Sequence, residues 1–227
     1  MYKLFIANKN YSSWSLRPWA IMHALELTFE EQVIPFGADS NWEAFRQFAP
    51  AGKVPCLHDG DQVVWDSLGI IEYLAEKHQG VWPRTTAERA WARCAAAEMH
   101  SGFTHLRQTC PMHVGFRIKL KHISPELQRD LDRLNELWCE GLNKFGGPYL
   151  AGDKFTAVDA FFAPVIFRIQ TYGLALSEMA QAYVNRQLRH PVLHRWEKQA
   201  LNENWREKSH EEAALAAGEL LIDHRRN

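Results

Sequence analysis

The alternation of apolar and polar positions changes character near residue 82. Before that point, short apolar runs typical of buried strands alternate with segments whose apolar residues recur at helical spacing. Two of the runs flank Asp59-Gly60-Asp61, a turn sequence that indicates a hairpin. The predicted order is β-α-β-α-β-β-α, with strands at 2–7, 29–34, 54–58 and 62–65 and helices at 15–26, 41–48 and from Leu68 to about residue 78.

Beyond the linker-like stretch Trp82-Pro83-Arg84-Thr85, the pattern predicts helices alone. Thr85 and Glu88 have the spacing of a capping box and open a long helix towards Thr109. An α/β half followed by an all-α half indicates two domains, at residues 1–82 and 88–227. The remaining predicted helices lie at roughly 125–145, 156–169, 177–188 and 191–203, and the tail from Ser209 is helical in composition.

Composition and charge exclude several classes of partner. Hydrophobic residues make up 46% and charged residues 23% of the 227 residues, as in ordinary soluble globular proteins. A formal net charge of −1 gives no electrostatic reason to expect nucleic acid or an anionic membrane as partner. No apolar run approaches the roughly 18 residues of a membrane span, and no secretory signal opens the chain. We therefore expect a cytoplasmic protein.

Metal or redox chemistry is not expected either. The four cysteines include no C-x-x-C pair. His190 and His194 are four residues apart, but no third ligand accompanies them, so surface histidines are the favoured interpretation.

Three serines gather in YSSWSLRPWA, residues 11–20, where the first predicted strand gives way to a helix. Ser13 or Ser15 suits the role of N-cap, which accounts for one hydroxyl. A helix N-terminus after a strand also suits an anion, and a serine hydroxyl can donate to a thiolate. No Ser-His-Asp arrangement or G-x-S-x-G motif surrounds these serines, so a base-activated serine is not expected.

Two further stretches leave alternatives open. The proline in Val54-Pro55 is either an edge-strand proline or part of a cis peptide that leaves the Val54 backbone free to pair with something else. Asp66-Ser67 either caps the following helix or holds the carboxylate and ammonium of a ligand. The residues alone favour the structural alternative in both cases.

Taken together and in order, these stretches resemble the cytosolic glutathione S-transferases, with bacterial members and the zeta class as the nearest pattern. The likeness covers nearly the whole chain. It implies a thioredoxin-like α/β N-terminal domain that binds glutathione, an all-α C-terminal domain and a homodimer. The segments that carry it are YSSWSLRPWA, GKVPCL, WDSLGIIEYLAE, AEMHSGFTHLR and FTAVDAFFAPV.

The resemblance also implies roles for individual residues. Ser12 is expected at the glutathione thiol, with Ser13 as the second candidate, whereas Ser15 is expected to cap or pack. The Val54 backbone is expected to pair with the cysteinyl backbone of glutathione beside a cis Pro55. The glutathione-binding set is Lys53, Val54, Pro55, Asp66 and Ser67, of which the last two hold the γ-glutamyl end.

A second-substrate pocket is expected between the first-domain loop and the long helix of the second domain. Arg168 is either a solvated or dipole-pairing arginine or a clamp for the carboxylate of an acidic substrate. Zeta-class maleylacetoacetate isomerases usually carry Cys where this chain has Trp14, which argues against isomerase activity. The candidates for this pocket are Trp14, His100, Phe103, His105, Arg107, Arg168 and Tyr172.

The expected function is therefore a glutathione S-transferase that activates the glutathione thiol with a serine hydroxyl for attack on a small electrophile, without a metal. Lowering a thiol pKa of about 8.5 by two units requires roughly 2.7 kcal/mol. A hydrogen bond to a charged group supplies about 1.5–3 kcal/mol and a helix N-terminus about 0.3–1 kcal/mol. The alternatives are a glutathione-dependent isomerase, a dehalogenase and a non-catalytic glutathione-binding regulatory protein of the same fold.

Overall fold

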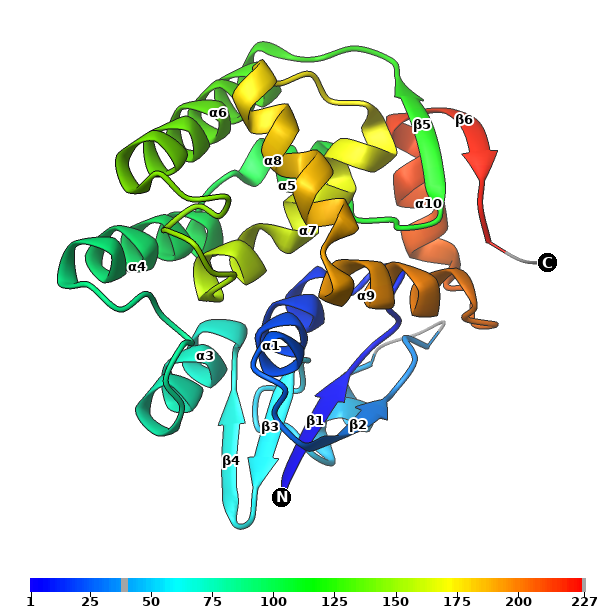
Figure 1. Ribbon diagram of the computed structural model, residues 1–227. Coiled ribbons are helices and arrows are strands. Elements are labelled where there is room, and N and C mark those ends of the chain that lie inside the picture. The colour runs from blue at the N-terminus through cyan, green and yellow to red at the C-terminus, as the bar shows by residue number, and fades with distance from the viewer. Residues whose placement is uncertain (38–40, 226–227) are drawn as a thin grey trace.

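A mixed four-stranded sheet and a helical domain make up the computed structural model, which describes residues 1–37 and 41–225 (Figure 1). The strand order in the sheet is β2-β1-β3-β4, with β1 and β2 parallel and the other pairs antiparallel. The predicted β-α-β-α-β-β-α order is confirmed. Its elements are β1 Tyr2–Ile6, α1 Ser13–Ala24, β2 Phe29–Val33, α2 Trp42–Arg46, β3 Cys56–Asp59, β4 Gln62–Trp65 and α3 Ser67–Lys77.

The helical domain follows, and its central element is α7, in which every residue except Gln170 is buried. The other helices of this domain, except the last, pack around α7 or around one another. Within the described residues, no helix combines the length and apolar character needed to cross a bilayer. The helices are α4 Thr86–Ser101, α5 Thr104–Thr109, α6 Pro125–Phe145, α7 Ala157–Tyr172, α8 Glu178–Arg189, α9 Pro191–Leu201 and α10 Lys208–Ala217.

Helix α1 joins the two halves of the molecule. It contacts β1 and α3 on one side and α7 and α9 on the other (Figure 1). Because it is covered from both sides, its residues from Ser15 to Met22 are all buried, including Arg17. The segment that begins with the serine motif is therefore fixed at the contact between sheet and helical domain. We propose that the boundary between the two domains lies in residues 78–85 between α3 and α4, a segment of turns and bends.

The predicted long helix from Thr85 to Thr109 is interrupted. Gly102 is extended, and Phe103 has a left-handed backbone with φ of 53°. The Phe103 side chain is 6% exposed and packs edge-on against Phe162 of α7, so burial of this ring favours the break over a continuous helix. The chain resumes as α5, whose Leu106 N–H donates to the Asp130 carboxylate.

The C-terminal domain is helical, as predicted, but the expectation of helices alone beyond residue 82 is wrong. β5 (Phe116–Leu120) pairs antiparallel with β6 (Gly218–Asp223). The pairing requires a glycine at 218, because a Cβ there would lie 2.2 Å from the Lys119 carbonyl oxygen. The tail thus docks on the helical domain instead of extending into solvent.

A buried carboxylate ties the start of α7 to its surroundings. Asp159 is fully buried and accepts hydrogen bonds from the Leu150 N–H at 3.1 Å, the Thr156 N–H at 3.0 Å and the Tyr183 hydroxyl at 2.9 Å. Burial raises the pKa of Asp159 to about 6. Asp159 therefore holds the start of α7 through a structural network of buried hydrogen bonds.

Replacing Asp159 with alanine should lower the free energy of unfolding by about 3 kcal/mol or more, because three buried donors would lose their acceptor. Urea denaturation followed by circular dichroism measures the change. Asp153→Ala, which removes an exposed carboxylate from the same region, is the control and should alter stability by less than about 0.5 kcal/mol. Equal effects of the two substitutions would contradict this role of Asp159.

Candidate functional site

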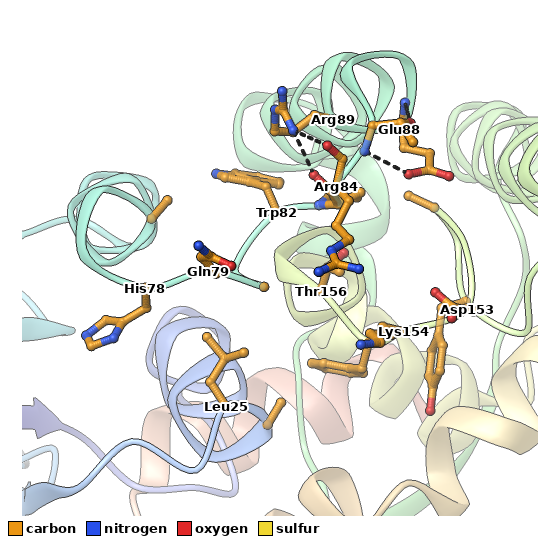
Figure 2. A pocket seen from close by; sticks show the side chains of 18 of the residues that line it. Leu25, His78, Gln79, Trp82, Arg84, Glu88, Arg89, Asp153, Lys154 and Thr156 are labelled. Carbon is orange, nitrogen blue, oxygen red and sulfur yellow. Dashed lines mark hydrogen bonds between the residues drawn. The ribbon is translucent and has the colours of Figure 1, made fainter.

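Among the hollows in the described part of the surface are two that are each large enough for a small ligand. The larger, of about 1200 Å³, lies along the linker between α3 and α4 and is closed on its other side by the segment before α7 (Figure 2). Its hydrogen bonds serve helix starts: Arg89 donates to the carbonyls of Pro83 and Arg84, and Thr85 and Glu88 form the predicted capping box. None of the site residues predicted from the sequence lines it.

The smaller hollow, of about 480 Å³, lies where the serine motif meets the helical domain. We call it the serine pocket. Within the described part of the chain, no three His, Cys, Asp or Glu side chains gather as ligands for a metal. The predicted residues that line the serine pocket are Ser12, Ser13, Trp14, Lys53, Val54, Arg107 and Arg168.

The loop between β1 and α1 is buried and is held by the C-terminal domain. The Glu203 carboxylate accepts from the Lys9 N–H at 2.6 Å and from the Asn10 N–H at 3.2 Å. The Trp196 indole donates to the Lys9 carbonyl at 3.0 Å, and the Val114 N–H donates to the Asn10 carbonyl at 3.2 Å. These bonds satisfy a loop that would otherwise carry unpaired buried backbone groups.

The serines of the motif form a short hydrogen-bonded chain. Ser15 Oγ accepts from the Ala7 N–H at 3.3 Å and lies 2.6 Å from Ser12 Oγ. Ser12 is the N-cap residue of α1, but its side chain makes no capping bond, so the expectation that Ser13 or Ser15 caps this helix is wrong. The Ser12 side chain is only 5% exposed and borders the serine pocket.

Asp66 and Ser67 open α3, as the sequence predicts. Asp66 Oδ1 accepts from the Leu68 N–H at 2.8 Å, which confirms the cap. The other carboxylate oxygen lies 3.6 Å from His100 Nε2, and the backbone of Asp66 has a φ of 67°, a strained value for a residue other than glycine. Ser67 is 1% exposed, and its Oγ accepts from the buried Arg17 guanidinium at 3.5 Å.

The peptide bond between Val54 and Pro55 is cis, as the resemblance implied. Pro55 is buried behind Val54, whose backbone borders the serine pocket. In the chain as described, neither the N–H nor the carbonyl of Val54 takes part in a hydrogen bond with another residue. An extended peptide can therefore pair with this backbone.

Two arginines of the helical domain, Arg107 and Arg168, form the wall of the serine pocket opposite the N-terminal domain. Arg107 Nη1 donates to the carbonyls of His100 at 3.3 Å and Gly102 at 3.2 Å, at the end of α4. Arg168 donates to the carbonyls of Arg107 and Cys110, at the end of α5. Arg168 is only 5% exposed, so it is not a solvated arginine, and it pairs with carbonyl groups at the end of α5.

Trp14 stands beside these cations. The guanidinium carbons of Arg17 and Arg107 lie 4.2 and 4.9 Å from the centre of its ring, and His100 meets it edge-on at 5.2 Å. Burial lowers the pKa of His100, and the charges of Arg17 and Arg107 act in the same direction. His100 contacts Trp14 but does not itself line the serine pocket.

Three other candidates for the second-substrate pocket do not line the serine pocket, and neither do Pro55, Asp66 and Ser67 of the predicted glutathione-binding set. Phe103 packs in the core, and the Tyr172 hydroxyl donates to the Pro111 carbonyl at 2.8 Å, which fixes the loop after α5. His105 is exposed on α5 and does not line the serine pocket. The lining also contains residues that the sequence did not suggest: Tyr11, Phe36, Asn41, Trp42, Phe45, Gly52, Pro111, Met112 and His210.

His210 comes from the C-terminal tail, which no local signal connects to the serine motif. Its ring stacks on Tyr11 with centroids 5.1 Å apart and on Phe36 at 4.8 Å. The next residue, Glu211, accepts hydrogen bonds from the Tyr11 hydroxyl and from Arg225. The tail thus covers one side of the serine pocket.

Glu211 also pairs with a buried histidine. His113 Nε2 lies 3.1 Å from its carboxylate, and Arg225 Nη2 lies 2.9 Å away. Burial alone would raise the pKa of Glu211. Hydrogen bonds from His113, Arg225 and Tyr11 nevertheless hold this pKa well below its ordinary value. We call these four residues the tail cluster.

Comparison with known proteins gives two family matches. Residues 11–77 match the model "Glutathione S-transferase, N-terminal domain", and residues 88–199 match "Glutathione S-transferase, C-terminal domain". Together these matches span most of the chain.

Individual relatives and a solved structure agree with these matches. The chain is 28% identical over 185 residues to Glutathione S-transferase 1 of Dianthus caryophyllus, covering 78% of this chain and 82% of the relative. It is 28% identical over 182 residues to a probable maleylacetoacetate isomerase of Caenorhabditis elegans, covering 74% and 81%. A glutathione transferase homologue from Burkholderia, solved with bound glutathione, shares the fold with a TM-score of 0.65 at 20% identity, covering 88% of this chain and 97% of that one.

The depressed pKa of Glu211 predicts an acid dependence of stability. Such a carboxylate stabilises the fold fully above its unfolded value of about 4.3, and this contribution is lost as the pH falls below that value. Glu211→Gln should therefore lower stability near neutral pH and flatten its decline between about pH 5 and pH 3, as measured by urea unfolding at each pH.

Glu212→Gln is the matched control, because the neighbouring Glu212 is 65% exposed and pairs only with Lys208 among the described residues. Its stability should follow that of the wild type at every pH. An unchanged acid slope in Glu211→Gln would show that the tail cluster does not carry this stability.

Proposed function

The chain belongs to the glutathione S-transferase family, and from this premise we propose that it is a glutathione transferase of the serine type, similar to zeta-class and bacterial members, which activates the glutathione thiol with Ser12. The thiolate attacks a small electrophile held against the helical domain. As the resemblance implies, the enzyme works as a cytoplasmic homodimer.

The observation that carries the proposal is the hydrogen-bonded chain from Ala7 through Ser15 to Ser12, which ends at the serine pocket. A backbone N–H only donates, so the bond from Ala7 makes Ser15 Oγ an acceptor. The Ser15 hydroxyl can then donate to Ser12 Oγ, 2.6 Å away, which leaves the Ser12 proton for a group in the serine pocket. A thiolate needs such a donor, so its binding favours this arrangement.

The free energy that Ser12 and the start of α1 supply is large enough to lower the thiol pKa of bound glutathione by about one to two units. A hydrogen bond to a charged acceptor contributes about 1.5–3 kcal/mol, which corresponds to roughly one to two pKa units. The start of α1, directly after Ser12, adds about 0.3–1 kcal/mol in favour of an anion. Ser12 and the helix therefore activate the thiol at neutral pH without a general base.

Glutathione fits the N-terminal wall of the site. The unpaired backbone of Val54 suits the cysteinyl backbone of the tripeptide, and exposed Lys53 lies beside it. Since Arg17 can only donate, the Ser67 hydroxyl keeps its proton for the γ-glutamyl carboxylate. The exposed oxygen of Asp66 suits the γ-glutamyl ammonium.

Isomerisation and dehalogenation use the same thiolate, and the C. elegans relative is named as a probable maleylacetoacetate isomerase. Trp14 favours transfer over isomerisation, because an indole pinned by two arginines stands where zeta isomerases usually carry a cysteine. A regulatory protein without turnover would have no need for a donor chain that ends in its pocket.

The test is Ser12→Ala. We expect kcat/KM for 1-chloro-2,4-dinitrobenzene and glutathione to fall about 10- to 100-fold, the loss of one hydrogen bond to a charged group. Glutathione affinity, measured by calorimetry, should change by less than about threefold, because the peptide is held elsewhere.

Ser13→Ala is the matched control, since the Ser13 hydroxyl makes no hydrogen bond within the described residues, and it should retain most of the activity. Ser15→Ala should give an intermediate loss, because Ser12 would lose the group that orients it. Full activity of Ser12→Ala, or a larger loss in Ser13→Ala, would contradict the assignment.

A further inference from the structure

The wall of the serine pocket has an unbalanced charge. Lys53, Arg107 and Arg168 line it, whereas no Asp or Glu of residues 1–37 and 41–225 does. Elsewhere in the chain, several arginines have carboxylate partners: Arg133 pairs with Glu98, for example. The described lining of the serine pocket thus brings together three cations and no carboxylate.

Three guanidinium groups lie at or next to the serine pocket: Arg107 and Arg168 line it, and Arg17 contacts Trp14, which also lines it. Among the described residues, none of Arg17, Arg107 and Arg168 forms an ion pair, and the Nε atoms of Arg17 and Arg168 are buried without a hydrogen-bond partner. Burial, together with the charges of Arg107 and Arg168, lowers the pKa of Arg17 to about 9, so the group remains charged at neutral pH. Asp66 acts on the charge of Arg17. Buried charges are normally paired, and an anionic ligand would supply the charged partner that Arg107 and Arg168 lack among the described residues.

Glutathione does not account for all of this charge. On the proposed function, its γ-glutamyl carboxylate lies at Ser67 in front of Arg17, and its peptide lies at Val54 beside Lys53. Arg107 and Arg168 belong to the opposite, C-terminal wall, which is where the second substrate has to approach Ser12.

Both wall arginines are held in place before any ligand arrives. Arg107 Nη1 is fixed by two carbonyls at the end of α4, and Arg168 Nη1 by two at the end of α5. A guanidinium has five N–H donors, so each keeps donors for a second acceptor. Guanidinium groups that are held in place in this way lose little conformational entropy when they bind a carboxylate.

We propose, on the basis of the proposed function, that the second substrate is an organic anion, an electrophile that carries a carboxylate, and that Arg107 and Arg168 bind this carboxylate while its electrophilic carbon faces the thiolate at Ser12. Trp14 keeps Arg107 turned towards the pocket through its ring contact. The preference for an anion distinguishes this site from a purely apolar pocket.

A matched pair of aryl chlorides tests the preference. The substrates are 4-chloro-3,5-dinitrobenzoate and its methyl ester, each assayed with the full-length enzyme and glutathione. In both, the thiolate forms a C–S bond at the chlorine-bearing carbon, and chloride leaves with the electron pair of the C–Cl bond. Dividing each kcat/KM by the uncatalysed rate with glutathione removes the intrinsic difference in reactivity.

The wild type should accelerate the carboxylate at least about tenfold more than the ester, as expected for one charge-assisted contact. Arg107→Met should reduce this ratio about tenfold or more, and Arg107→Lys should restore part of it. Arg129→Met is the control, because Arg129 is exposed on α6 and pairs only with Glu126 among the described residues, and it should leave the ratio unchanged.

Failure of the anion proposal and failure of the proposed transferase function give different results. Equal acceleration of carboxylate and ester, or a ratio unaffected by Arg107→Met, would overturn the anion proposal and leave the transferase intact. If glutathione binds but neither chloride is conjugated, the proposed transferase function fails, and the anion proposal fails with it.

Discussion

The serine pocket depends on hydrogen bonds that the C-terminal domain forms with the backbone of the loop between β1 and α1. The Glu203 carboxylate binds two successive N–H groups of this loop, and Trp196 binds the carbonyl between them. Because the loop is buried, these polar groups need partners, and the sheet to which β1 belongs does not supply them. The position of Ser12 is therefore set by residues about 190 positions away in the chain.

This constraint explains why the residues that line the serine pocket come from both halves of the molecule. The N-terminal domain supplies the free Val54 backbone and the hydroxyl chain at Ser12, and the helical domain supplies the cations of the opposite wall. The tail adds His210 and is anchored through Glu211 to Tyr11, the neighbour of Ser12. A single set of contacts thus fixes the loop and completes the pocket.

The sequence predicted most of the fold, because the elements up to α3 and most of the later helices have local periodicity and clear caps. It missed β5 and β6, since each is short and its partner lies about 100 residues away. It also missed the break at Gly102, which depends on burial of Phe103. The resemblance, and not the residue types alone, pointed to seven of the residues that line the serine pocket. The bond from the Ala7 N–H to Ser15 and the anchoring of Arg168 depend on the folded backbone, which residue types do not reveal.

The central claim is that this loop presents a hydroxyl donor to the glutathione thiol. The most direct measurement is an ultraviolet titration of the thiolate of glutathione bound to the wild-type protein, with free glutathione as reference. The donor at Ser12 predicts that the bound thiol ionises about one to two pH units below the free value of about 8.5. A bound thiol that ionises at the free value would contradict the account.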